Sequence, residues 1–222
     1  HAIVSPVPSL FTFNIKDPRI AALPGVAAQV SVKVKDTKLE TSGPLLITHW
    51  GMSGPAILKL SAWGARILHD KNYQFTIFVN WLNDLDAENV EKTLKKLKLE
   101  HAKKAVSKKS PFDLTNRLWE SLVMNSGIES ETKWADLSKN QLQNLSNQLT
   151  NSVFQVNGKS TFKEEFVTAG GIDLKEINFK TMESKLHENL YFAGEIVNID
   201  AVTGGYNFQN AWTSGFIVAN SI

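Results

Sequence analysis

The sequence predicts an α+β protein: an antiparallel, β-rich and barrel-like domain, interrupted by a small helical insert and followed by a C-terminal strand, loop and helix. Three observations support this prediction. Apolar and polar residues alternate in parts of residues 1–83, a helical period replaces the alternation in residues 84–150, and glycine-rich loops with an apolar helix close the chain. Alternation puts every second side chain on one face of a half-buried antiparallel strand.

The expected β-rich domain covers residues 1–83 and 151–186. Residues 30–34 alternate strictly between apolar and polar side chains, and residues 74–79 do so over part of their length. Residues 153–156 (VFQV) are expected to return to strand after the helical stretch. Short runs of this kind form antiparallel strands with one buried face, in a sheet or a barrel.

Residues 84–150 are expected to form a three-helix insert, because leucines recur there at helical intervals. Asp86, Ser110 and Ser138 mark the expected starts of the three helices. Short polar side chains at such places accept hydrogen bonds from the first free N–H groups of a helix. Gly127 marks the expected end of the second helix.

The composition is that of an ordinary globular protein. Of the 222 residues, 42% are hydrophobic and 21% are charged, which is enough for one large or two small cores. The absence of cysteine excludes disulfides and thiolate metal sites, and a formal net charge of +2 does not require an anionic partner. No histidine pair stands at metal-ligand spacing with a carboxylate, so no metal is expected. No apolar run is long enough to span a bilayer.

The end of the chain is expected to form a strand, a loop and a helix. Residues 190–192 are apolar and precede a glycine and an acid, Gly194 and Glu195, which predicts a tight turn carrying a carboxylate. Further on, Gly204 and Gly205 let the backbone approach a large ligand, because they have no Cβ atoms. The helix that follows begins with free N–H groups and a positive dipole end, which favour an electron-rich partner.

Three stretches resemble the bacterial FAD-binding flavoproteins of the aminoacetone-oxidase and BaiN type. They are residues 190–216 (LYFAGEIVNIDAVTGGYNFQNAWTSGF), residues 166–172 with 181–185 (FVTAGGI and TMESK), and residues 46–58 (LITHWGMSGPAIL). The resemblance covers essentially the whole chain. It implies that residues 187–222 belong to a FAD domain built from two dinucleotide folds.

Flavoproteins of that type begin with a βαβ unit whose GxGxxG loop holds the FAD pyrophosphate. No GxGxxG occurs in this sequence. The resemblance therefore implies a fragment that consists of the middle domain and the C-terminal flavin-contacting segment. Its implied partner is the missing N-terminal FAD-binding lobe of the same protein.

The resemblance also implies which residues contact FAD. They are glycines that expose the backbone and polar residues near the C-terminal helix: Gly170, Gly171, Gly194, Glu195, Thr203, Gly204, Gly205, Tyr206, Asn207 and Gln209. The pair Gly170 and Gly171 has an alternative explanation as a tight turn between strands, but one residue with positive φ would suffice for such a turn, so flavin contact is favoured.

Two further residues are candidates for a catalytic role, although no catalytic residue is assigned. His49 either lines the substrate side of the flavin or fixes the turn before a helix that starts near Ser53, and the local role is favoured. Lys185 either faces the isoalloxazine or helps to fix the crossover between domains, and the structural role is again favoured.

Residues 92–109 hold eight lysines, a density that suits contact with a phosphate backbone. The run contains no arginine and no aromatic residue that could stack on a base. Glutamates also stand four residues before lysines, as in the pair Glu88 and Lys92, which favours ion pairs along a helix. We therefore favour a solvated helix face.

The function implied by the resemblance is that of a cytoplasmic FAD-dependent oxidoreductase, with hydride transfer through flavin N5. It would be an NAD(P)H-dependent reductase or an amine-oxidase-like enzyme that acts on a small molecule, with no nucleic acid and no membrane as partner. The competing hypothesis is a non-catalytic binding domain that contacts nucleic acid through the lysine-rich helices of residues 92–109.

Overall fold

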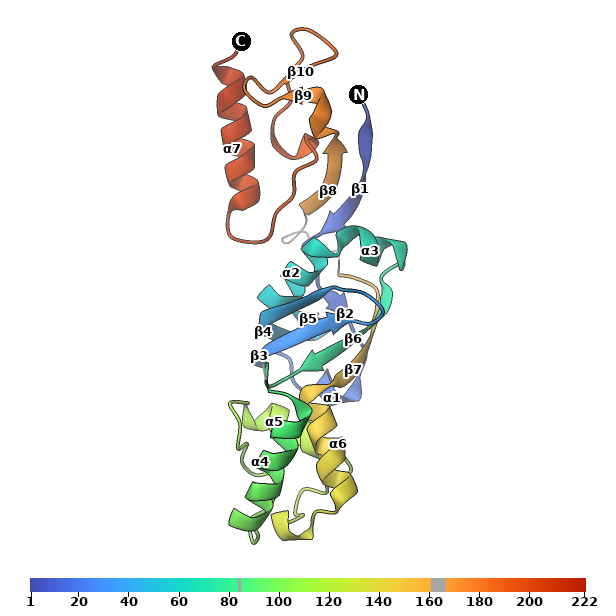
Figure 1. Cartoon of the computed structure of the whole chain (residues 1–222), viewed down its shortest axis with the longest axis vertical. Coiled ribbons are helices and arrows are strands. Elements are labelled where there is room, and N and C mark those ends of the chain that lie inside the picture. Colours follow the sequence, from blue (N-terminus) through green and yellow to red (C-terminus); the bar gives the residue numbers. More distant parts are fainter. Residues whose placement is uncertain (84, 161–166) are drawn as a thin grey trace. The chain divides into compact units, whose positions relative to one another are not determined.

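The structure, a computed structural model, describes residues 1–83, 85–160 and 167–222 (Figure 1). Contacts within the chain define two compact units, and each is described here by itself. Both units contain strands and helices, and the sheets are antiparallel, so the expected α+β class is confirmed. Unit 2 comprises residues 12–60 and 73–160, and unit 1 comprises residues 1–11, 61–72 and the described residues from 167 onward.

Unit 2 is built on a six-stranded sheet in which every neighbouring pair is antiparallel. The strands, in spatial order, are β2 (Phe13–Asn14), β5 (Gly51–Ser53), β4 (Glu40–Thr48), β3 (Ala27–Val34), β6 (Gln74–Asn80) and β7 (Ser152–Asn157). In β3, Val30, Val32 and Val34 are fully buried, whereas Ser31 and Lys33 face away from the core. The alternation predicted for these residues is therefore confirmed.

The sheet curls so that its two edges come together. Phe13 in β2 forms an antiparallel bridge with Lys159, which lies just beyond β7. Beside it, the amide of Asn14 donates a hydrogen bond of 3.0 Å to the carbonyl oxygen of Gly158. Closure of this kind pairs the backbone groups of edge strands, and it gives the sheet its barrel-like form.

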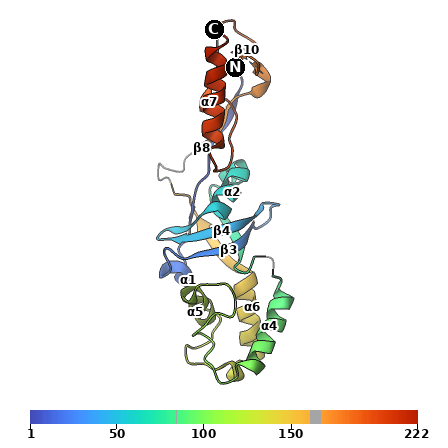
Figure 2. The same cartoon turned by 90° about the vertical axis from the view of Figure 1, so that its left-hand side faces the viewer.

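Several helices of unit 2 lie between its strands in the order of the chain. They are α1 (Pro18–Ala21), the start of α2 (Pro55–Trp63), α4 (Ala87–Glu100), α5 (Asn116–Met124), a short 3₁₀ helix η1 (Trp134–Asp136) and α6 (Lys139–Thr150). Figures 1 and 2 both show α4, α5 and α6 grouped at one end of the sheet. They form the helical stretch that the sequence predicts in residues 84–150, and they lie between β6 and β7 in the chain.

Of the three predicted helix starts in the insert, two are confirmed by the observed caps. Asp86 accepts a hydrogen bond from the amide of Asn89 at the start of α4, and Ser138 forms a capping box with Gln141 at the start of α6. The expected start of the second helix at Ser110 is wrong. There the Ser110 hydroxyl bonds locally to the backbone of the residue two positions on, which makes a turn, and α5 begins only after its cap, Thr115.

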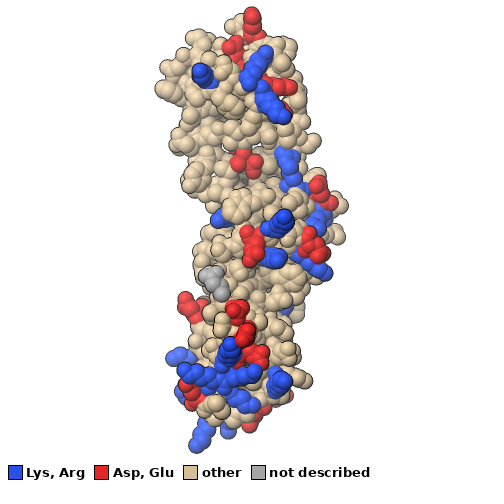
Figure 3. All heavy atoms as spheres, viewed as in Figure 1, with Lys and Arg blue, Asp and Glu red and all other residues tan. Residues whose placement is uncertain are grey.

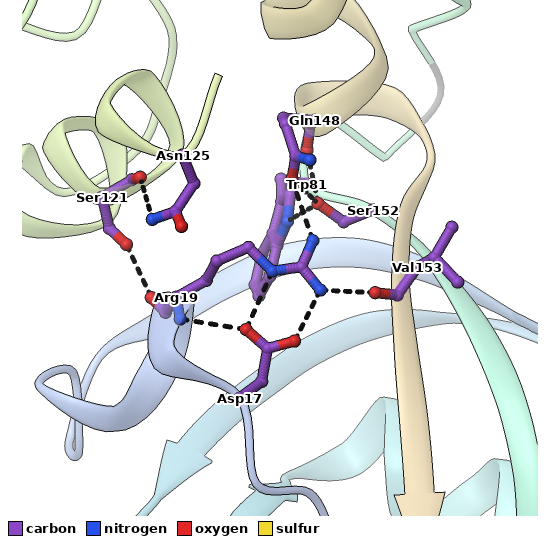
Figure 4. Close-up of polar contacts among 8 residues, drawn as sticks. All are labelled: Asp17, Arg19, Trp81, Ser121, Asn125, Gln148, Ser152 and Val153. Atoms are coloured by element: carbon purple, nitrogen blue, oxygen red, sulfur yellow. Dashed lines mark hydrogen bonds and ion pairs between the residues drawn. The ribbon is translucent and has the colours of Figure 1, made fainter. Parts of the chain in front are cut away.

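A polar network joins α1 to α6 and β7 (Figure 4). Asp17 caps α1 and pairs with Arg19 at 2.7 Å, and both side chains are largely buried. Arg19 also donates to Gln148 at 2.9 Å and to the carbonyl oxygen of Val153, and its guanidinium lies 4.1 Å from the ring centre of Phe154. Burial raises the pKa of Asp17, but the hydrogen bonds and charge of Arg19 outweigh it and hold that pKa below its ordinary value.

Replacing Asp17 with Asn should lower the free energy of unfolding at pH 7 by about 1–3 kcal/mol, because Arg19 would lose its charged partner. Since the folded-state pKa of Asp17 lies below its unfolded value, its contribution is present above the unfolded pKa and is lost as the pH falls through the folded pKa. Urea unfolding at neutral and acid pH measures both effects. Asp70→Asn, at a side chain that is 81% exposed, is the control and should change stability by less than about 0.5 kcal/mol.

Unit 1 contains two short antiparallel pairs. The strand β1 (Ile3–Ser9) pairs with β8 (Val167–Ile172), and β9 (Ile177–Asn178) pairs with β10 (Glu183–Ser184). The remaining elements are α3 (Ala65–Asp70), the 3₁₀ helices η3 (Leu174–Glu176) and η4 (Gly194–Ile196), and α7 (Tyr206–Ala219). A small core of Ile172, Ile177, Met182 and Val197 packs against Ile217 and Val218 of α7, among other residues.

The strand expected at residues 190–192 is reduced to one isolated bridge, between Tyr191 and Glu183. The helix expected after the glycine loop is confirmed as α7. The expected domain boundaries, which placed residues 151–186 with 1–83 and began the last part at residue 187, stay a prediction. In the structure β1 and β8 lie with the C-terminal elements.

Among the described residues, none of the helices is long and apolar enough to cross a membrane.

Candidate functional site

The turn at Gly194 in unit 1 is fixed to α7 by Ser214, a residue that the sequence did not single out. Ser214, which is buried in α7, accepts a hydrogen bond of 2.9 Å from the amide of Gly194. Its hydroxyl in turn donates to the carbonyl oxygen of Asn210 at 2.6 Å. Gly194 has φ of 75°, a conformation that favours glycine, so it turns the chain into η4 at the point where Ser214 holds it.

Asn207 closes the loop that precedes α7. Its side-chain oxygen accepts from the amide of Ala201, and its side-chain nitrogen donates to the carbonyl oxygen of the same residue, both at 3.0 Å. Nearby, the Ser9 hydroxyl donates to Asp200 at 3.2 Å. The amide of Asn207 is thus engaged in holding the loop. An asparagine in the first turn of a helix after a Gly-Gly pair is a usable signal for this local role, because its side chain readily bonds to nearby backbone.

The start of α7 is open. Gly205, with φ of 84°, occupies the N-cap position and provides no side-chain cap. A Cβ atom built at Gly205 would meet nothing within 4 Å, and the nearest atoms to one built at Gly204 would be those of the Tyr206 ring, the closest at 3.0 Å. Thr203, Tyr206 and Gln209 are exposed around this point. The first turn of α7 therefore presents backbone N–H groups and a positive dipole end beside free space.

Glu195 lies in η4, one residue after the glycine that Ser214 holds. Its side chain is exposed, and the residues that the structure describes provide it with no hydrogen-bond or ion-pair partner. Because Ser214 ties the backbone of η4 to α7, the turn with Glu195 and the helix α7 are brought together in one unit. Whether Glu195 contacts a cofactor stays a prediction.

Gly170 and Gly171 are accounted for by packing within unit 1. Both have positive φ, of 127° and 124°. A Cβ at Gly170 would lie 2.8 Å from the backbone of β1, and one at Gly171 would lie 2.3 Å from the carbonyl oxygen of Ile196. The parallel bridge from Ile172 to Val197 explains this close approach. The glycines thus bring β8 against η4, and flavin contact at them stays a prediction.

Lys185 is held by backbone contacts. Its ammonium donates to the carbonyl oxygen of Lys175 at 2.8 Å, and its amide donates to the carbonyl oxygen of Glu176 at 2.8 Å. Just before it, Met182 is buried with φ of 60°. These contacts agree with the structural role favoured for residues 181–185, and a catalytic role for Lys185 stays a prediction.

His49 lies in unit 2, at the turn between β4 and β5. Together with Trp50 and α1 it lines a pocket of about 900 Å³. Asn14 and Thr48 line the same pocket, and each has one buried side-chain oxygen without a hydrogen-bond partner. His49 itself is exposed. The proposed site residues therefore fall in two places: the loops around α7 in unit 1, and this pocket in unit 2.

An apolar stripe runs along the exposed side of α7. Phe208, Trp212 and Phe216 stand four residues apart on the helix, and each is about 70% exposed, at 68%, 70% and 71%. Phe208 and Trp212 stack with their ring centres 6.0 Å apart. Single exposed apolar residues need no explanation, but a continuous aromatic stripe of this size is typical of a surface that another part of a protein covers.

Within the described ranges, no group of three or more His, Asp or Glu side chains is arranged to hold a metal ion.

The curled antiparallel sheet and the helical group that interrupts it define a class of protein, a barrel with a helical insert. The family model for the HI0933-like protein barrel and H2TH domain matches residues 7–167. The chain belongs to this family, which is part of the FAD-dependent oxidoreductase superfamily. The resemblance to FAD-binding flavoproteins is thereby confirmed at the level of the superfamily.

Three curated proteins are similar to the chain. It is 33% identical over 222 residues to a ribosomal RNA dihydrouridine synthase from Haemophilus influenzae, covering 99% of this chain and 52% of that protein. It is 32% identical over 178 residues to the protein of the same name from Escherichia coli, covering 80% and 42%. It is 25% identical over 228 residues to a 3-dehydro-bile acid delta(4,6)-reductase from Clostridium scindens, covering 100% and 54%. The chain spans about half the length of these relatives.

Proposed function

We propose that the protein is a FAD-dependent oxidoreductase in which the flavin ring lies against the open start of α7. The observation that carries this proposal is the uncapped first turn of α7 beside Gly205, where a Cβ atom would meet nothing within 4 Å. Backbone N–H groups at a helix start favour negative charge, such as that on a reduced flavin. Gly194, Glu195, Thr203, Gly204, Tyr206 and Gln209 surround this space or lie on the segment leading to it.

The chain's own residues would position the cofactor and leave the redox chemistry to it. Bound FAD would supply the chemistry of hydride transfer between NAD(P)H and the substrate. Ser214 and Asn207 hold the two loops at their present places through the hydrogen bonds described above. The aromatic stripe on α7 would be covered by the N-terminal dinucleotide-binding lobe of the whole protein, which would also hold the pyrophosphate. We also propose that the protein is located in the cytoplasm.

The substrate that we propose is a uracil ring in ribosomal RNA. Support comes from the two relatives at 33% and 32% identity, both named ribosomal RNA dihydrouridine synthase. Forming dihydrouridine adds one hydride and one proton across the C5–C6 double bond of uracil, while NAD(P)H is oxidised to NAD(P)⁺. This proposal replaces the expectation of a small-molecule substrate without nucleic acid.

A second candidate is the reduction of a conjugated ring in a small molecule. The relative at 25% identity, named a 3-dehydro-bile acid delta(4,6)-reductase, supports it. Both reactions add hydride to a carbon–carbon double bond that a carbonyl activates, so one flavin site could serve either.

The substrate test uses the full-length protein with FAD and NAD(P)H under anaerobic conditions. Ribosomal RNA from cells that lack the gene should gain dihydrouridine, measured by mass spectrometry of its nucleosides, with one NAD(P)H consumed per dihydrouridine formed. No dihydrouridine, together with rapid reduction of a 3-dehydro-bile acid carrying delta(4,6) unsaturation, would reject the RNA substrate in favour of the second candidate. Amine-dependent oxygen uptake instead would identify an oxidase.

A further inference from the structure

The positive charge of the helical insert is unevenly distributed. Helix α4 carries four lysines and three glutamates, a net charge of +1. The ten residues that follow it, 101–110, carry four lysines and neither Asp nor Glu, a net charge of +4 with histidine neutral. Figure 3 shows Lys and Arg side chains gathered over the helical part of unit 2 on the face in view. Most of the net positive charge of residues 87–110 therefore lies in the segment that follows α4.

The lysines of α4 itself are largely balanced by ion pairs. Lys92 pairs with Glu88 at 2.7 Å and Lys95 pairs with Glu91 at 2.6 Å. Lys96 lies 3.6 Å from Glu100, and Lys98 donates to the carbonyl oxygen of Leu137. For α4, the solvated helix face favoured from the sequence is the better explanation, because these pairs leave little charge for a partner.

Residues 101–110, which we call the lysine turns, differ from α4 in their net charge and in the ion pairing of their lysines. It forms two successive turns between α4 and α5, and each turn carries adjacent lysines: Lys103 and Lys104 in the first, Lys108 and Lys109 in the second. All four side chains are exposed. In the part of the chain that the structure describes, only Lys108 has an ion-pair partner, a loose contact of 3.8 Å with an exposed glutamate.

The backbone of the lysine turns is fixed by a neighbouring segment. The amide of Val106 donates to Thr132, and the amide of Trp134 donates to the carbonyl oxygen of Lys104. Beneath them the buried rings of Trp119 and Trp134 stack, and the indole N–H of Trp119 donates to the carbonyl oxygen of Val106 at 2.8 Å. Two pairs of lysines are thus presented on an ordered support, which reduces the ordering cost of binding an anionic partner.

We propose that the lysine turns contact the phosphate backbone of the ribosomal RNA substrate. This inference rests on the proposed function. Lysine ammonium groups bind phosphates as point charges, and contacts of that kind position an RNA without reading its sequence. Residues 101–110 contain no Phe, Tyr or Trp to stack on a base. The lysine turns therefore supply affinity and orientation, and the choice of uridine is made elsewhere.

Two variants of the full-length protein that remove the same charge test the proposal. The turn variant carries Lys103→Gln, Lys104→Gln and Lys109→Gln. The helix variant carries Lys92→Gln, Lys95→Gln and Lys96→Gln, at lysines that already have glutamate partners. Binding of deproteinised ribosomal RNA is measured by filter retention over a series of KCl concentrations. Melting temperature and flavin content of each variant establish that it is folded.

The turn variant should bind RNA on the order of tenfold more weakly, and the slope of log K against log salt should fall by about 2–3, since each phosphate contact contributes about 0.7–0.9. The helix variant should change the slope by less than about 1. Equal losses in both variants would overturn the proposal while leaving an RNA substrate intact.

No RNA binding by the wild-type protein would remove both the lysine-turn proposal and the RNA substrate. Vesicles of phosphatidylglycerol and phosphatidylcholine form the last arm of the experiment. If they bind the wild-type protein as tightly as RNA does and depend on the same three lysines, the surface is a membrane contact and the proposal is overturned.

Discussion

Gly171→Ala should destabilise the protein by about 3–5 kcal/mol. The new Cβ would lie 2.3 Å from the carbonyl oxygen of Ile196 and 2.9 Å from the carbonyl carbon of Val197, so β8 and η4 would have to separate. The φ of 124° adds backbone strain of about 1–3 kcal/mol. The shift would disrupt the small core that contains Ile172 and Val197. The free energy of unfolding, from urea titration of the full-length protein, measures the effect.

Gly127→Ala is the matched control for this substitution. Gly127 also has positive φ, at 76°, but a Cβ built there would meet nothing within 4 Å. It should therefore cost only the backbone strain, about 1 kcal/mol. If both substitutions lower the free energy of unfolding by the same amount, the close approach of β8 to η4 is not the reason for a glycine at position 171. A ligand contact at Gly171 would then be supported instead.

Gly205→Val should have the largest effect on activity. The side chain would enter the free space at the start of α7, where the proposed flavin lies, and a β-branched residue at φ of 84° would add strain of about 1–3 kcal/mol. Turnover should fall on the order of 100-fold, because displacing a reacting group by about 1 Å has an effect of that size. Flavin-to-protein ratio, melting temperature and NAD(P)H-dependent flavin reduction are the measurements.

Gly127→Val is the control for the activity experiment, since it makes the same change at positive φ in the helical insert, which belongs to unit 2. It should lower the melting temperature while leaving flavin content and flavin reduction unchanged. Normal flavin occupancy and turnover in Gly205→Val would remove this loop from the flavin site. Glu195 and the rest of α7 would then be the remaining candidates.

Much of the fold follows from local sequence patterns. The alternation in β3 and the caps at Asp86 and Ser138 depend on interactions within a few residues, so they could be predicted. The start of α5 could not, because Ser110 and Thr115 both suit a cap, and the turn at Ser110 forms instead. The pairing of β1 with β8 could not be predicted either, since the two strands are far apart in the sequence.

The candidate site shows the same limit. A Gly-Gly pair indicates that something approaches the backbone closely, but the sequence does not say whether that is a ligand or another segment of the chain. At Gly170 and Gly171 the approaching groups are β1 and η4, whereas at Gly205 the space is open. Ser214, which fixes Gly194, was missed because a single serine in an apolar helix gives no sign of a partner twenty residues earlier.

Flavin content of the full-length protein tests the central proposal most directly. The protein, purified in the presence of FAD and then freed of excess cofactor, should retain close to one FAD per chain, and the bound flavin should be bleached by NAD(P)H under anaerobic conditions. A folded full-length protein that retains no flavin, or whose bound flavin is not reduced by NAD(P)H, would contradict the account.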